Sequence, residues 1–264
     1  TFDELIATGT YSLMPNYSQL FTVANENNSE TVFDVQYSGL EGASYGCYIC
    51  AEGNIAAGFG GIRQYVGPVY SDGNSYNLPT QELYDAFSSI DQRRQTTILD
   101  IDAFIAVQPA PNDITYAIGA GGHTGFYSNK YIKRLDEMGL PDNDLTSPVN
   151  YRVIRYADVL LMLAEALGES TQAYAYINQV RARAGLPAIS ATTAGTFAEK
   201  LLNERRIEFA LENQRWQDLL RFGVAKATLA KQLAIPQADV RLLYAIPQKE
   251  IDVSNGKLVQ NPGY

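Results

Sequence analysis

The sequence predicts a mainly α-helical protein in which helical hairpins are joined to a large irregular, loop-rich region with a few short strands. Two observations predict the hairpins: apolar residues recur at helical spacing through residues 151–222, and helix-starting and helix-ending residue types stand at matching positions. A third observation predicts the irregular part, because residues 39–77 are rich in Gly and Tyr and follow no sustained period.

The first predicted hairpin starts at Tyr151. Its first helix carries two apolar stripes, one with Val153, Tyr156, Leu160, Leu163 and Leu167 and the other with Ile154, Ala157, Leu161 and Ala164. The second helix is expected to begin at Ser170 or Thr171, whose hydroxyls can accept hydrogen bonds from first-turn amides, and to end at Gly185 before Pro187. The pair occupies roughly 34 residues, which is the length of a tetratricopeptide (TPR) unit.

A second hairpin is predicted to stack on the first, because a single hairpin cannot bury both of its apolar faces. Its two helices carry Phe197, Leu201, Leu202 and Phe209, and then Trp216, Leu219, Leu220 and Phe222. We therefore expect one unit with three parts: an irregular ligand-facing region with short helices (1–150), TPR-like hairpins (151–232), and an extended C-terminal segment that packs back on the domain (233–264).

The composition and net charge disfavour some classes of ligand. The 264 residues are 46% hydrophobic and 19% charged, which is ordinary for a globular protein, and the net charge is −9. A negative chain without a dense Lys/Arg run is a poor partner for nucleic acid or anionic lipid, and an uncharged or cationic ligand is easier to accommodate. No stretch approaches the roughly 20 apolar residues that a membrane-spanning helix needs.

Four phrases occur in order along the helical part: RYADVLLMLAEAL (155–167), INQVRARAGLP (177–187), ERRIEFALENQRWQDLLRFG (204–223) and IPQKEIDVSNGKLVQNPGY (246–264). Weaker matches lie upstream at SETVFDVQYS (29–38), LPTQELYDAFSSIDQRR (78–94) and KYIKR (130–134). Together they resemble the C-terminal half of the SusD/RagB family of outer-membrane nutrient-binding lipoproteins of Bacteroidetes. The resemblance spans nearly the whole chain.

The resemblance implies a non-catalytic protein without a cofactor that captures oligosaccharide at the cell surface and delivers it to a SusC-like TonB-dependent transporter, which the hairpins would contact. Family members are about twice as long and start with a signal peptide and a lipid-bearing cysteine. We therefore expect a C-terminal portion whose lipid anchor lies in an absent N-terminal half, itself an expected partner of this chain. A peptide ligand is the alternative, since the family includes both kinds of binder.

Tyrosines among glycines are the candidate binding residues. A Tyr ring offers a sugar or a peptide both stacking area and a hydrogen-bonding hydroxyl, and loops on a rigid scaffold commonly carry binding groups. The resemblance adds that the family binds through surface aromatics of its irregular part. The predicted ligand-binding residues are Tyr45, Tyr48, Arg63, Tyr65, Tyr70, Tyr76 and His123. The alternative for any single ring is that it fills a gap beneath a loop.

Three further motifs invite a metal or phosphate interpretation. Cys47 and Cys50 form a single C-x-x-C without a second pair, which favours a local disulfide or two ordinary thiols over zinc or redox chemistry. The run GAGGHTG (119–125) lacks the third glycine of a dinucleotide fingerprint and the lysine of a phosphate loop, so we expect a loop near the ligand. PDNDLTSP (141–148) supplies possible calcium ligands in Asp142, Asn143 and Asp144 but reads as a turn, and no metal site is predicted.

One pair of carboxylates allows an enzymatic hypothesis. Asp158 and Glu165 lie two turns apart on one helix, roughly 10 Å along its axis, near the separation used by inverting glycosidases. Structural ion pairing with the arginines on these helices explains both acids more simply, because charges on packed helices need partners. A glycoside hydrolase using these two acids is therefore the less favoured alternative, and we predict that the protein is not an enzyme.

Overall fold

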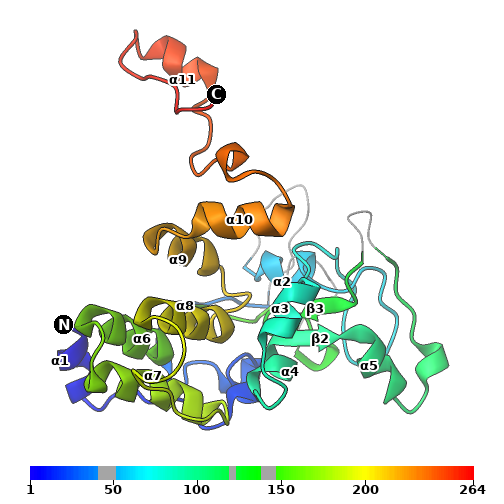
Figure 1. Cartoon of the computed structure of the whole chain (residues 1–264). Coiled ribbons are helices and arrows are strands. Elements are labelled where there is room, and N and C mark those ends of the chain that lie inside the picture. Colours follow the sequence, from blue (N-terminus) through cyan, green and yellow to red (C-terminus); the bar gives the residue numbers. More distant parts are fainter. Residues whose placement is uncertain (41–51, 119–122, 138–146) are drawn as a thin grey trace. The chain divides into compact units, whose positions relative to one another are not determined.

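The computed structural model describes residues 1–40, 52–118, 123–137 and 147–264 (Figure 1). Short helices dominate, strands are few and short, and the predicted fold class is confirmed. The chain divides into two compact units, Thr1–Glu212 and Asn213–Tyr264. This single division falls between residues 212 and 213, whereas sequence analysis placed boundaries at 150 and 232.

The first unit holds most of the regular structure. Its helices are α1 (Phe2–Ala7), α2 (Ile55–Phe59), α3 (Gln81–Ala86), α4 (Arg93–Thr97), α5 (Ile101–Ala106), α6 (Tyr156–Leu167), α7 (Thr171–Arg183) and α8 (Phe197–Glu208). Its strands form two small antiparallel sheets, β1 (Thr31–Val35) with β4 (Tyr151–Arg155) and β2 (Ile98–Asp100) with β3 (Phe126–Ser128).

The second unit contains α9 (Arg215–Arg221), α10 (Ala225–Leu233) and α11 (Gln248–Val253). The segment expected to be extended after residue 232 therefore includes a helix and a 3₁₀ turn at Gln237–Asp239. The predicted second hairpin is also divided, because α8 belongs to the first unit and α9 to the second.

The first hairpin consists of α6 and α7, which pack against each other and against α8. The Ser170 side chain accepts a hydrogen bond from the Ala173 amide and starts α7, as predicted, and Gly185 follows the helix with a φ of +74°. The start of α6 was predicted five residues too early. Residues 151–155 are a strand, because their backbone groups pair with β1, so Val153 and Ile154 lie outside the helical stripes.

The irregular region has a hydrophobic core of its own. Eight buried residues form it: Ile62, Tyr65, Tyr70, Leu99, Ile101, Ile114, Tyr127 and Ile132. They come from loops, from the small sheet of β2 and β3 and from the start of α5, so apolar contacts rather than a long ladder of backbone hydrogen bonds hold this region together.

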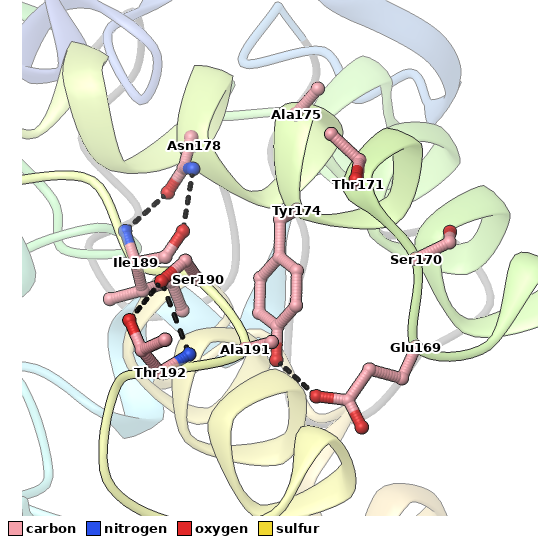
Figure 2. A pocket seen from close by; sticks show the side chains of 10 residues that line it. All are labelled: Glu169, Ser170, Thr171, Tyr174, Ala175, Asn178, Ile189, Ser190, Ala191 and Thr192. Carbon is pink, nitrogen blue, oxygen red and sulfur yellow. Dashed lines mark hydrogen bonds between the residues drawn. The ribbon is translucent and has the colours of Figure 1, made fainter.

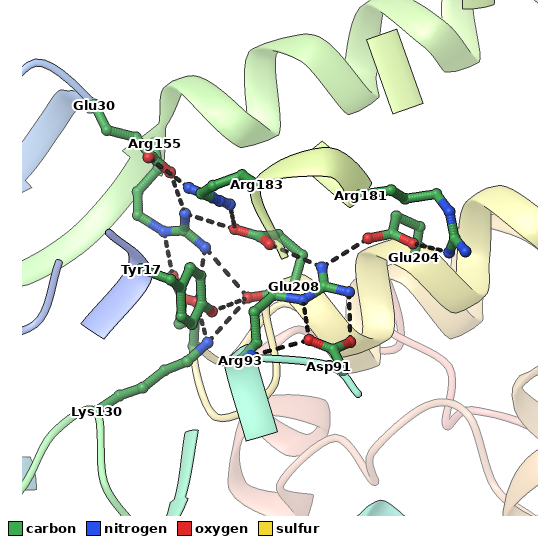
Figure 3. A network of polar contacts seen from close by, with 11 residues as sticks. Tyr17, Glu30, Asp91, Arg93, Lys130, Arg155, Arg181, Arg183, Glu204 and Glu208 are labelled. Carbon is green, nitrogen blue, oxygen red and sulfur yellow. Dashed lines mark hydrogen bonds and ion pairs between the residues drawn. The ribbon is translucent and has the colours of Figure 1, made fainter. Parts of the chain in front are cut away.

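A buried network of ion pairs joins this region to the hairpins (Figure 3). Arg155, at the end of β4, forms ion pairs with Glu30, Glu208 and Glu212, and its Nη2 group also donates a hydrogen bond to the backbone carbonyl of Glu208. Arg93, at the start of α4, forms ion pairs with Glu204 at 2.6 Å and Glu208 at 3.0 Å. Segments far apart in the sequence therefore meet at the C-terminal end of α8.

The network is balanced in charge. Its cations are Arg93, Lys130, Arg155, Arg181 and Arg183, and its anions are Glu30, Asp91, Glu204, Glu208 and Glu212. Burial alone raises the pKa of Glu208, but the surrounding arginines outweigh it and hold that pKa well below its ordinary value. Because each charge has an opposite partner, the network can stay ionised without water.

Candidate ligand-binding site

The loop at residues 58–76 is folded back on itself by backbone hydrogen bonds. The amide of Gly73 donates to the carbonyl of Ile62 at 2.8 Å, and the amide of Tyr76 donates to the carbonyl of Phe59 at 2.8 Å. A Cβ on Gly73 would lie 2.4 Å from the backbone carbon of Gly61, so only glycine permits this approach. The glycines of this region thus bring two of its aromatic residues together.

The fold of the loop places Tyr76 beside Phe59, with ring centroids 6.0 Å apart. Tyr76 is 61% exposed, which leaves most of its ring free for a ligand. Ser75, next to it, accepts a hydrogen bond from the Arg63 amide at 3.1 Å and lies 3.4 Å from the hydroxyl of Tyr127. The loop is thereby anchored to β3.

His123 makes two further aromatic contacts, one of them with Tyr127. The ring of His123 lies 6.2 Å from that of Tyr127 and 5.4 Å from that of Tyr116. We call Phe59, Tyr76, Tyr116, His123 and Tyr127 the aromatic cluster. Tyr127 is fully buried and supports it, whereas Phe59, Tyr116 and His123 are partly exposed. Such a combination supplies apolar ring area with polar atoms at its edge.

Two hydroxyls of the cluster, those of Tyr116 and Tyr127, have raised pKa values. Burial and the adjacent Asp102 carboxylate, which accepts a hydrogen bond from the Tyr116 hydroxyl at 3.2 Å, raise the pKa of Tyr116 to about 12. Burial likewise raises the pKa of Tyr127. These two hydroxyls therefore stay uncharged at neutral pH, which suits an uncharged ligand.

The structure brings three of the predicted site residues together and separates two others from solvent. Arg63, Tyr76 and His123 lie in or beside the aromatic cluster. Tyr65 and Tyr70 are only 5% and 6% exposed and pack edge to face in the core, the alternative that sequence analysis left open for any single ring. Their binding role stays a prediction, and one that burial disfavours. Tyr45 and Tyr48 lie outside the described residues.

Sequence reasoning missed Phe59, Tyr116 and Tyr127. Tyr116 and Tyr127 stand outside the glycine-rich stretch, and no local pattern connects them to it. Sequence analysis listed His123 among the predicted ligand-binding residues. Its Nε2 atom is buried and has no hydrogen-bond partner among the described residues, so His123 contributes its ring rather than this nitrogen.

The proposed carboxylate pair is placed for structure. Asp158 is buried and accepts a hydrogen bond from Arg205 of α8 at 2.7 Å, as an ion pair between two packed helices. Sequence analysis expected structural ion pairing with the arginines of these helices, and Arg205 supplies it. The ion pair engages the Oδ1 atom of Asp158 and gives this acid a structural role.

Metal binding finds no support within the described ranges. Outside the gaps at 41–51, 119–122 and 138–146, the structure holds no group of three or more His, Cys, Asp or Glu side chains suited to a metal ion. Cys47, Cys50, Asp142, Asn143, Asp144 and the first four residues of the glycine run lie in those gaps. Of the helices that the structure describes, none has the length and hydropathy to cross a membrane.

Comparison with known proteins assigns the family. Residues 9–241 match the SusD family, and the chain belongs to it. It is 30% identical to SusD-like protein P2 of Formosa agariphila across 96% of this chain and 52% of that protein. It is 29% identical to a SusD-like protein of Bacteroides ovatus across 79% of this chain and 37% of that protein. The resemblance noted in the sequence is thus confirmed.

Solved structures support the same family assignment. A laminarin binding SusD-like protein is 35% identical, with a TM-score of 0.81 over 97% of this chain and 54% of the other. Surface glycan-binding protein A from Bacteroides thetaiotaomicron, in complex with laminarihexaose, is 28% identical, with a TM-score of 0.82 over 98% of this chain and 58% of the other. The chain spans about half the length of SusD-like protein P2 and of these two solved structures.

Proposed function

We propose that this chain binds a glycan of the laminarin type, without cleaving it, at the aromatic cluster. The observation that carries the proposal is the exposed Tyr76 ring, held beside Phe59 and Arg63 by the glycine-rich loop, in a SusD-family chain. Solved relatives that bind laminarin or hold laminarihexaose supply the ligand class.

Binding would proceed by capture alone. The apolar face of a sugar ring stacks on Tyr76 and Phe59, while hydroxyls of the sugar exchange hydrogen bonds with polar atoms at the rim of the cluster. Contacts of this kind are individually weak, so we expect an affinity between micromolar and millimolar, about −4 to −8 kcal/mol. The Asp158–Arg205 ion pair supports the absence of catalysis, because a paired acid is a poor proton donor.

The family suggests the cellular location and the transport partner. We propose that the chain acts on the outer face of the outer membrane, within a lipid-anchored protein, and delivers its glycan to a SusC-like TonB-dependent transporter. Membership of the SusD family supports this assignment. Pull-down of such a transporter from the native membrane by the complete protein would test it.

Replacement of Tyr76 tests the binding site. Tyr76→Ala removes the exposed ring and is expected to weaken retention in a laminarin gel about fivefold, since a stacked aromatic is worth roughly 1 kcal/mol. Tyr244→Ala is the matched control, because Tyr244 is 85% exposed and lies in the other unit. The measurement is affinity electrophoresis, with release of reducing sugar ends assayed alongside.

Equal retention of the two variants would refute the site. Release of reducing ends by the unmodified chain would refute the non-catalytic role, and Asp158→Asn would then show whether the carboxylate pair is responsible. Binding to immobilised peptides without any retention by glycans would favour the peptide alternative.

A further inference from the structure

A hollow lies on the hairpin, and no residue of the aromatic cluster is part of its lining. Figure 2 shows the side chains that line it. It is bounded by residues 169–178, at the start of α7, and by the loop at residues 189–192, and its volume is about 590 Å³. We call it the α7 hollow. Sites for small molecules commonly fall between about 300 and 1,000 Å³, so the space is large enough for part of an oligosaccharide.

The walls of the α7 hollow are fixed by hydrogen bonds. The side-chain amide of Asn178 donates to the carbonyl of Ile189 at 2.9 Å, and its oxygen accepts from the amide of Ile189 at 2.8 Å. Beneath them, the buried ammonium of Lys200 donates to the carbonyl of Ser190 at 3.0 Å and to the hydroxyl of Tyr174 at 3.1 Å. A site whose walls are already ordered loses little entropy when a ligand enters.

The chemistry of the lining favours a neutral ligand with hydroxyl groups. Glu169 is its one charged residue, and the Tyr174 hydroxyl donates to the Oε1 atom of this carboxylate at 2.8 Å. The Oε2 atom accepts no hydrogen bond from the residues that the structure describes, so it can accept one from a ligand hydroxyl. Ala175 and Ile189 supply apolar surface for the C–H face of a sugar.

Charge argues against an anionic ligand. An anion would be repelled by Glu169, and the nearby cation Lys200 is 9% exposed and donates its hydrogen bonds to neutral oxygens. We infer that the α7 hollow is a second, weaker carbohydrate subsite, in which Glu169 accepts hydrogen bonds from sugar hydroxyls. The inference rests on the proposed glycan-binding function for its ligand, but not on the aromatic cluster for its location.

A second subsite would act mainly on long chains. A polysaccharide held at the aromatic cluster can reach a further weak site on the same unit without new loss of translational freedom, which raises its apparent affinity. An oligosaccharide too short to span the two sites lacks this gain, because each of its molecules fills one site at a time. The α7 hollow would thus favour capture of polymer over short fragments.

Laminarihexaose titrated into the ¹⁵N-labelled 264-residue chain, followed by amide chemical shifts, tests the inference. Shift changes are expected at the amides of Ala173, Asn178 and Thr192 as well as around Tyr76. Ala175→Trp should fill the hollow and abolish the first set, while Ala182→Trp, also exposed and on the same helix but outside the lining, should preserve it. Glu169→Gln should weaken binding at the hollow at least threefold.

The outcomes separate the two proposals. Shifts around Tyr76 with none at the α7 hollow would overturn the second subsite and leave the proposed function intact. Shifts at neither place would overturn both. Shifts at the hollow produced by unrelated peptides and not by the hexasaccharide would overturn its carbohydrate assignment. Ala175→Trp should also weaken retention in a laminarin gel at least threefold relative to Ala182→Trp, and equal retention would count against the role in polymer capture.

Discussion

The most unusual single residue is Lys130, an ammonium group buried completely in the first unit. Its Nζ atom lies 2.6 Å from Glu212 and donates to the carbonyl of Glu208 at 2.9 Å. Burial lowers the pKa of Lys130 to about 8, although Glu212 partly offsets the effect. At this position, the loss of hydration therefore lowers the pKa by more than the ion pair with Glu212 raises it.

Lys130 predicts a pH dependence of stability. Between pH 8 and its ordinary pKa of 10.5, the unfolded chain keeps the Lys130 proton while the folded chain releases it, so the contribution of this group to the free energy of unfolding rises with pH. We expect the stability of Lys130→Met relative to the unmodified chain to fall from pH 8 to 9.5. Urea denaturation at several pH values measures this difference.

The comparison ends at pH 9.5 because burial raises the folded-state pKa of several tyrosines above 10. At higher pH these tyrosines ionise first in the unfolded chain, which lowers the free energy of unfolding. Lys226→Met is the control, since Lys226 is exposed and should show the same pH profile as the unmodified chain. If Lys130→Met also follows that profile, the lowered pKa is refuted.

At the scale of elements, backbone pairing decides how the candidate site is built. The loop at residues 58–76 has little regular structure, yet hydrogen bonds between residues 58–62 and 73–76 hold it in one conformation. The close approach of Gly61 and Gly73 makes those bonds possible, so glycine content here is a condition for order rather than a sign of flexibility. Backbone pairing also sets the start of α6, because residues 151–155 pair with β1 instead of forming the predicted helical turn.

Gly73→Ala tests this element. The new Cβ would lie 2.4 Å from the backbone carbon of Gly61, which must shift. We expect a loss of stability of about 1–3 kcal/mol. Retention in a laminarin gel should also weaken, because Tyr76 moves with the loop. Gly60→Ala is the control, because the nearest atom to its Cβ is 3.3 Å away. Chemical denaturation and affinity electrophoresis measure the two effects, and equal behaviour of the variants would contradict the account.

Within the unit Thr1–Glu212, the buried ion pairs connect the irregular region to α6, α7 and α8, alongside an apolar cluster that includes Ile98, Phe126 and Ile207. Glu208 forms ion pairs with Arg93 of α4, Arg155 of β4 and Arg183 of α7. Loss of one partner leaves several buried guanidinium groups incompletely paired, which is costly. We therefore expect the two regions to unfold together.

Glu208→Gln should destabilise the unit by about 3–5 kcal/mol, the usual cost of breaking a buried ion pair. Native-state hydrogen exchange should show the same reduction in opening free energy for core amides of β2 and of α6. Glu82→Gln is the control, because Glu82 pairs with Arg206 at the surface and is 57% exposed, so its loss should cost less than about 1 kcal/mol. A reduction confined to α6 would show that the regions unfold independently.

The sequence by itself determined the family, the fold class, the start of α7 at Ser170 and the structural pairing of Asp158 with an arginine. These features depend on local periodicity, capping residues and the need of buried charges for partners, which are readable in the linear chain. Only the tertiary structure decided which tyrosines are exposed: Tyr65 and Tyr70 lie in the core, while Tyr76 meets Phe59 at the surface. In an irregular region without a period, long-range packing rather than local pattern sets which face of each ring meets solvent.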